Sequence, residues 1–128
     1  MTPKLAALFV NYNAGEELRV ALASVRDAAR EAGWTWEAVV VDNASRDGSG
    51  TITRDFAPEA RLIQNRENVG FGRAVNQGLA ASSAPLVLIM NPDCRLAPDA
   101  LTALEAVLQR EPGCAIVCLL YTSPSPRD

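Results

Sequence analysis

Short apolar runs alternate along the chain with longer stretches in which apolar residues recur every three or four positions. The short runs are continuous rather than alternating, which is typical of strands that are buried on both faces of a parallel sheet. We therefore predict strands at residues 5–10, 38–41, 61–64, 86–90 and 115–120.

The longer stretches have helical periodicity. Leu18, Leu22 and Val25 fall on one stripe of the first stretch, and Gly33 follows as a helix-ending glycine. Pro98 marks the start of the last stretch. Strands and helices thus alternate, which predicts an α/β fold with a mostly parallel sheet and helices on both faces. The helices are predicted at residues 16–32, 50–56, 72–82 and 98–111.

Polar and glycine-rich segments directly follow four of the predicted strands. Because parallel sheets bind ligands outside the carboxyl ends of their strands, these segments form a candidate site. Turns and helix caps use the same residue types, so the recurrence at four successive strand ends is what indicates a site. The segments are residues 11–13, 42–49, 65–72 and 91–93.

Asp42 is the first candidate within these segments, because a carboxylate directly after a buried strand needs a polar ligand or a helix to cap. It could accept hydrogen bonds from ribose hydroxyls or from a base N–H. Ser45 and Asp47 could equally form a turn and cap the next short helix.

The segments after the third and fourth strands indicate phosphate and metal binding. Gly70 and Gly72 allow a ligand close to the backbone, and Arg73 is a potential phosphate partner. Asn76 and Gln77 lie one turn later, and either could face the site or solvent. Asp93 follows a proline-fixed turn, and one hard carboxylate with diphosphate oxygens and water suits Mg²⁺ or Mn²⁺.

The composition narrows the class of protein. The 128 residues are 48% hydrophobic and 21% charged, which fits one globular domain or part of a larger one. With 12 basic and 15 acidic side chains, the net charge of −3 offers no basic surface for nucleic acid or an anionic membrane. No apolar run reaches the roughly 20 residues of a membrane span, so we expect a cytoplasmic chain.

Histidine is absent, which excludes Ser-His-Asp and Cys-His catalysis and any histidine base. The chemistry must then use carboxylates, amides, hydroxyls, backbone groups or a metal bound by oxygen. Cys94, Cys114 and Cys118 lack the paired spacing of a zinc site, and we expect buried free thiols in a reducing compartment.

Three α/β classes do not match. A P-loop is excluded because Lys4 is the only lysine. A Rossmann dehydrogenase fits poorly, because Val75 stands where the third glycine would be and the motif follows the third strand rather than the first. A phosphoacceptor domain would need an acidic cluster and a late lysine, but the first strand ends in Asn11.

Together, the four segments resemble the family 2 glycosyltransferases of the GT-A fold, over about residues 5–117. The resemblance implies that a sugar is transferred with inversion from a nucleotide diphosphate donor to a hydroxyl of a glycan or lipid-linked acceptor. The D-N-x-S-x-D-G-S and N-P-D variants are similar to the rhamnosyltransferase branch, which implies dTDP-rhamnose or a UDP-hexose as donor. The matching stretches are residues 10–13, 41–49, 68–78 and 90–93.

The resemblance also implies roles for individual residues. Asp93 occupies the second acid position of the family's D-x-D motif and would bind Mg²⁺ or Mn²⁺ at the donor diphosphate, although Asn91 replaces the first acid. The catalytic base is expected farther along, so no catalytic residue is assigned in this chain. The nucleotide sugar would be held by Val10, Asn11, Tyr12, Asn13, Asp42, Asn43, Ser45, Asn68, Gly70, Gly72, Arg73, Asn76 and Asn91.

Residues 1–117 are thus expected to form the donor-binding part of a GT-A domain. The Ser-Pro repeats in residues 118–128 do not follow the family pattern and are expected to be a disordered or non-native tail. The chain is expected to be an inactive fragment of an enzyme that can act peripherally at the inner face of a membrane. Two alternatives stay open: a non-catalytic module that binds nucleotide sugars, and an unrelated α/β domain with similar loops.

Overall fold

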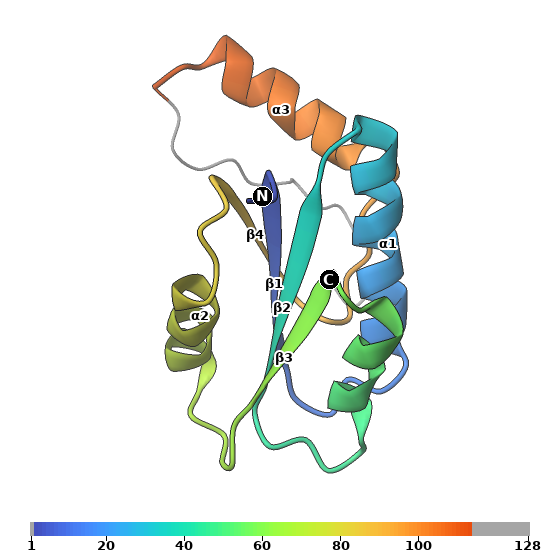
Figure 1. The fold of residues 1–128 in the computed structure, drawn as a ribbon, viewed down its shortest axis with the longest axis vertical. Helices are drawn as coiled ribbons and strands as arrows, with labels where there is room; N and C mark the ends of the chain where they lie inside the picture. Colours follow the sequence, from blue (N-terminus) through green and yellow to red (C-terminus); the bar gives the residue numbers. More distant parts are fainter. Residues whose placement is uncertain (1, 114–128) are drawn as a thin grey trace, which may run out of the picture.

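The computed structural model describes residues 2–113, and its centre is a four-stranded sheet (Figure 1). The strands are parallel in every pair and lie in the order β3-β2-β1-β4. The predicted α/β class is therefore confirmed. The fifth predicted strand at residues 115–120 and the tail at 118–128 lie outside the described residues. The strands are β1 (Leu5–Asn11), β2 (Trp36–Asp42), β3 (Ala60–Gln64) and β4 (Leu86–Met90).

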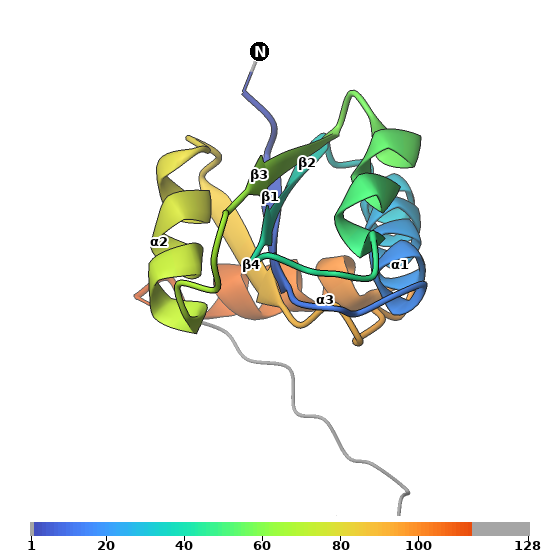
Figure 2. The ribbon, with the colours of Figure 1, turned by 90° about the horizontal axis from the view of Figure 1, so that it is seen from below.

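Helices cover both faces of this sheet, as the alternating pattern predicts. Figure 2 shows α2 (Phe71–Ala80) on one side of the sheet and α1 (Glu17–Ala32) with the 3-10 helix η1 (Ser49–Phe56) on the other. The helix α3 (Ala100–Arg110) shares the core of the α1 side. In the described part of the chain, no helix is both long and apolar enough to cross a bilayer.

The ends of the helices differ slightly from the prediction. Gly33 ends α1 with φ 71°, as expected of a helix-ending glycine. The last helix begins at Ala100 rather than at Pro98, because Ala97 O already accepts the Ala100 N–H in a preceding turn (3.0 Å). Pro98 therefore belongs to the turn that leads into the helix.

Two apolar cores lie on either side of the sheet. The larger one joins the sheet to α1, η1 and α3 and contains the fully buried Phe9, Leu18 and Leu22. The smaller one lies under α2, where the backbone approaches β1 closely: a Cβ on Gly78 would lie 1.9 Å from Cδ1 of Leu8. This close approach holds α2, and the loop before it, against the sheet.

The cysteine prediction is wrong for the one thiol that the described residues include. Cys94 is free, as expected, but it is exposed rather than buried. It lies in the loop after β4, next to Asp93. Partial desolvation by neighbouring atoms and the Asp93 carboxylate both raise the pKa of the Cys94 thiol. Cys114 and Cys118 lie outside the described residues.

Candidate functional site

The polar segments predicted to form a site converge because all four strands point the same way. Figure 1 shows the loops after β1, β2 and β3 gathered at one end of the molecule. Asn11 pairs in register with Asp42, and Asp42 pairs with Gln64. Register partners share a face of the sheet, so the last residues of these three strands form a polar row across the sheet.

Asp42 lies at the centre of this row and is only 1% exposed. Its Oδ1 accepts hydrogen bonds from Asn11 Nδ2 and Ser45 Oγ, both at 2.7 Å. Its Oδ2 accepts from Ser45 N at 2.9 Å and from Gln64 Nε2 at 2.8 Å. The polar partners that a buried carboxylate requires are thus supplied by the protein itself.

These contacts determine the charge of the Asp42 carboxyl. Burial alone would raise the pKa of Asp42, because the charged form loses its hydration. Hydrogen bonds donated by Gln64, Ser45 and Asn11 outweigh burial and hold the pKa of Asp42 below its ordinary value of 3.8. Asp42 is therefore a carboxylate at neutral pH, and among residues 2–113 neutral amide, hydroxyl and backbone N–H groups hold it in place.

Asn11 completes this buried network from β1. Its Nδ2 donates to Ser49 Oγ at 2.7 Å in addition to Asp42. Its Oδ1 is also buried but has no hydrogen-bond partner in the described part of the protein. An unpaired buried acceptor costs about 1–3 kcal/mol, so this oxygen is a point where a water molecule or a donor group of a ligand would be stabilising.

A second amide network connects β2 and β3 to α2. The side chains of Asn65 and Gln77 exchange two hydrogen bonds of 2.8 Å, and Asn65 also donates to Asn43 Oδ1 at 3.0 Å. Asn43 in turn donates to the carbonyl of Gly70 at 3.2 Å. The alternative left open for the residues after Gly72 is thereby decided: Gln77 faces this network, whereas Asn76 is exposed.

The loops after β1 and β2 are also joined. Ser45 Oγ accepts the Asn13 N–H at 2.9 Å, and Asp47 Oδ2 accepts the Gly15 N–H at 3.0 Å. Asp47 Oδ1 accepts the Ser49 N–H, and these hydrogen bonds lower the pKa of Asp47. Ser45 and Asp47 therefore form the turn that their residue types suggest, and they also hold the first loop in place.

The other predicted residues surround this network without joining it. Within residues 2–113, no side-chain hydrogen bond connects the network to Arg73, Asn76 or Asn91. Asn68 caps the backbone N–H of Gly70 at 2.9 Å. Val10 is half-buried, and the exposed members are Tyr12, Asn68, Gly72, Arg73, Asn76, Asn91 and Asp93. Their exposure leaves them accessible to a ligand at this edge of the sheet.

Besides Gln77, three members of the two networks were not named individually as site residues. Gln64 and Asn65 come at the end of the third strand, and Ser49 begins η1. The available signal was positional: Gln64 is a polar residue that ends an apolar run, as Asn11 and Asp42 do. Its contact with Asp42 depends on the strand register, which the apolar pattern alone does not give.

The loop after β4 can supply one carboxylate ligand to a metal ion. In the described ranges, no three His, Cys, Asp or Glu side chains gather as a metal-binding group. Asp93 is one exposed carboxylate beyond the strand end. It therefore suits Mg²⁺ or Mn²⁺ that takes its other ligands from phosphate oxygens and water, rather than a metal held by protein groups alone.

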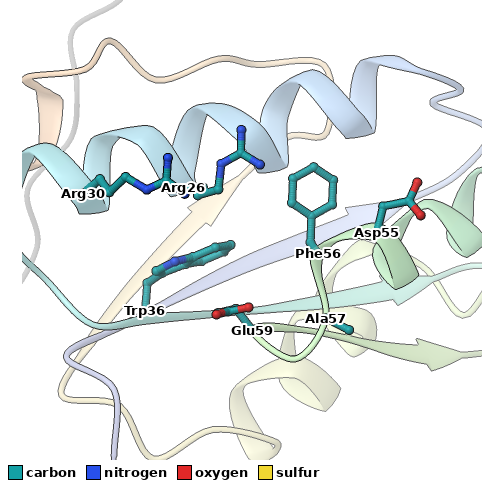
Figure 3. A pocket seen from close by; sticks show the side chains of 7 residues that line it. All are labelled: Arg26, Arg30, Trp36, Asp55, Phe56, Ala57 and Glu59. Carbon is teal, nitrogen blue, oxygen red and sulfur yellow. The ribbon is translucent and has the colours of Figure 1, made fainter.

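A cavity of about 290 Å³ lies away from this site (Figure 3). Its lining includes Arg26 and Arg30 of α1, Trp36 and Phe56, and the Arg26 guanidinium lies 5.6 Å from the Phe56 ring centre. Trp36 is the first residue of β2, whereas Asp42 is the last. The cavity is therefore beside the amino ends of the strands, and none of the predicted site residues lines it.

The comparison with known proteins agrees with this geometry. The model of the family described as "Glycosyl transferase family 2" matches residues 7–128. The chain belongs to this family. It is 29% identical over 135 aligned positions to N-acetylglucosaminyl-diphospho-decaprenol L-rhamnosyltransferase of Mycobacterium tuberculosis, covering 97% of the chain and 43% of that relative. It is 32% identical over 83 residues to dolichyl-phosphate beta-glucosyltransferase ALG5C of Trichomonas vaginalis, covering 62% of the chain and 25% of that relative.

Solved structures place the fold of this family 2 member in the GT-A class. S. aureus TarS 1-349 superposes with a TM-score of 0.71 at 21% identity, over 84% of the chain and 32% of TarS. Mannosyltransferase PcManGT from Pyrobaculum calidifontis, solved with GDP-Man and Mn²⁺, gives 0.70 at 24% identity, over 84% of the chain and 33% of its own length. The chain spans less than half the length of each of these four proteins.

Proposed function

We propose that this chain is the donor-binding part of an inverting glycosyltransferase that transfers a sugar from a nucleotide diphosphate to an acceptor hydroxyl. The observation that carries the proposal is the buried, ionised Asp42 at the point where β1, β2 and β3 end. Membership of glycosyltransferase family 2 supports the reaction type. The rhamnosyltransferase relative supports dTDP-rhamnose as donor, with a UDP-hexose as the second candidate.

The acceptor is proposed to be lipid-linked or a glycan. Both relatives are named for transfer that involves a polyprenyl-type lipid, decaprenol in one and dolichol in the other. The parent enzyme would then work peripherally at the inner face of a membrane. The residues that choose the acceptor and the general base that deprotonates its hydroxyl are not assigned among the described residues.

The exposed residues around the network would contact the donor directly. Tyr12, whose side chain is 55% exposed, offers a ring on which the base can stack beside Val10. Asp42 would accept a hydrogen bond from the base or ribose. Gly70 has open space where a Cβ would point, and the exposed Arg73 guanidinium, three residues later, would bind a phosphate.

The buried members of the site would instead hold these contacts in place. The side-chain donor groups of Asn11, Asn43 and Ser45 bond to other protein atoms, so their role would be to fix Asp42 and the loop at Gly70. Among the remaining predicted donor contacts, Asn13 lies in the loop after β1, which bonds to Ser45 of the loop after β2. A Cβ on Gly72 would meet no atom within 4 Å, so a ligand can approach its backbone. Asn68 and Asn91 are exposed amides in the loops after β3 and β4, and Asn76 is an exposed amide on α2.

Asp93 would hold a divalent cation, Mg²⁺ or Mn²⁺, together with the diphosphate of the donor. When bound, such a cation stabilises the negative charge that develops on the departing diphosphate. PcManGT, a structural neighbour solved with GDP-Man and Mn²⁺, supports this proposal. Asn91 stands two residues before Asp93 and adds no charge, so Asp93 would carry most of the protein's contribution.

Calorimetric titration of the chain with UDP and dTDP, in Mn²⁺ and in EDTA, tests the proposed function. The unmodified chain should bind at least one nucleotide more tightly in Mn²⁺. Asp93→Ala should remove that metal dependence and leave binding at the EDTA level. Asp99→Ala is the matched control, because Asp99 is another exposed aspartate in the same connection, and it should behave as the unmodified chain. A folded sample that binds neither nucleotide would contradict the proposal.

A further inference from the structure

The Asp42 carboxylate has no free position for an incoming ligand. An ionised carboxylate has about four acceptor positions, two on each oxygen. All are occupied, two by Asn11 and Ser45 on Oδ1 and two by Ser45 and Gln64 on Oδ2. The side chain is also only 1% exposed. A ligand that donates a hydrogen bond to Asp42 must therefore displace one of these donors.

The donors differ in how easily they can leave. Asn11 is fully buried, and its amide is also bonded to Ser49. Ser45 donates through its backbone N–H as well as its hydroxyl, so the turn itself holds it. Among these donors, only Gln64 is exposed, and it reaches Asp42 through the end of a flexible side chain. Displacing Gln64 disturbs the least structure.

A displaced Gln64 amide also has other hydrogen-bond partners within reach. In the free protein its Nε2 lies 3.1 Å from the carbonyl oxygen of Asn65 and 3.5 Å from that of Asp42, and the exposure of Gln64 gives a displaced amide access to water. If a ligand N–H or O–H then takes its place on Oδ2, Asp42 still accepts the same number of hydrogen bonds. Such an exchange avoids leaving a buried charge with an empty acceptor position, which would be costly.

We propose that Gln64 is a gate on Asp42: its amide occupies the acceptor position of the nucleotide in the free protein and swings away when the nucleotide binds. This inference rests on the proposed function, because it assumes that a base N–H or ribose hydroxyl bonds to Asp42. The gate admits ligands that donate a hydrogen bond, since only a donor can replace the amide of Gln64.

If Gln64 is a gate, removing its side chain should strengthen nucleotide binding, whereas removing a residue that supports the site should weaken it. Gln64→Ala removes the competitor, so UDP in Mn²⁺ should bind about two- to tenfold more tightly, the range expected for one hydrogen bond that no longer has to be broken. A supporting role predicts weaker binding instead. Gln109→Ala makes the same chemical change on the exposed face of α3 and should leave the affinity unchanged.

A second measurement on the unmodified chain removes the dependence on how well Gln64→Ala folds. The side-chain amide resonances of Gln64, assigned by their loss in Gln64→Ala, should move toward those of a solvent-exposed amide as UDP and Mn²⁺ saturate the protein. Weaker or unchanged binding by Gln64→Ala, or unmoved Gln64 resonances at saturation, would overturn the gate and leave the proposed function standing. Absence of UDP and dTDP binding by both proteins would overturn both.

Discussion

At the scale of single residues, the site is organised by one ionised carboxylate that the fold buries among neutral hydrogen-bond donors. Asp42 is tolerated because four hydrogen bonds replace its hydration. Asn11 contributes one of them and keeps a buried oxygen unpaired. The unpaired oxygen costs stability, the buried carboxylate needs all of its donors, and both occur at strand ends where a ligand can reach the protein. They are the physical marks of a binding site rather than of a core.

Replacing Asp42 tests how much its carboxylate contributes to the free energy of unfolding. Asp42→Asn presents an amide nitrogen to groups that also donate, so the free energy of unfolding at pH 7 should fall by about 2–4 kcal/mol. The pKa of Asp42 is lower in the folded than in the unfolded chain, so its stabilisation is present above the ordinary value near 3.8 and is lost as the pH falls through the folded pKa. Urea unfolding should therefore show a smaller difference between the two proteins at pH 3 than at pH 7.

Asp99→Asn is the control for this comparison, because Asp99 is exposed and its side chain caps no helix N–H. It should change the free energy of unfolding by less than about 0.5 kcal/mol at either pH. A difference between Asp42→Asn and the unmodified chain that is equally large at pH 3 and pH 7 would show that the carboxylate charge does not contribute.

At the scale of elements, the position of α2 decides where the loop at Gly70 lies. Two contacts fix that helix: Gly78 against Leu8 of β1, and Gln77 in the amide network with Asn65. The carbonyl of Gly70, at the helix start, accepts a hydrogen bond from Asn43 after β2. The helix therefore links packing in the smaller core to the arrangement of the site.

Alanine substitutions at two glycines of α2 distinguish a position packed against the sheet from one that has open space. Gly78→Ala would place a Cβ 1.9 Å from Leu8 Cδ1, so it should lower the free energy of unfolding by about 1–3 kcal/mol. Gly72→Ala meets nothing within 4 Å and should raise it by up to about 1 kcal/mol, because alanine favours the helix. Thermal unfolding of the two variants measures both effects.

A nucleotide titration of Gly72→Ala tests whether this glycine lies at the donor site. Gly72→Ala should bind UDP more weakly although it is more stable, because its methyl group projects where the donor is proposed to lie. Stronger or equal binding by Gly72→Ala would place the donor elsewhere.

The elements themselves could be predicted because their causes are local. Continuous apolar runs marked the four described strands to within two residues, and a stripe of apolar residues marked α1. The contact between Gln64 and Asp42 could not be predicted, since it depends on the register of β3 against β2. Cys94 was misplaced for a related reason: its residue type favours burial, but its position in a loop decides its exposure.

At the scale of the whole molecule, parallel strand direction is what gathers residues from four separate segments. Asp42 and Gly70 are 28 positions apart in the sequence, and Asn43 connects their surroundings through one hydrogen bond. The opposite edge of the sheet has its own cavity beside Trp36, with arginines and aromatic rings in place of amides and carboxylates. The two edges are therefore chemically distinct, and the nucleotide is proposed to bind only at the carboxyl ends of the strands.

Mapping of backbone and indole resonances during a titration with UDP or dTDP and Mn²⁺ tests this placement most directly. We expect the signals of residues 10–13, 42–45, 68–73 and 91–93 to shift together, while the indole N–H of Trp36 stays unchanged. Shifts centred on Trp36 and the cavity around it, with the strand carboxyl ends unmoved, would overturn the proposed nucleotide site.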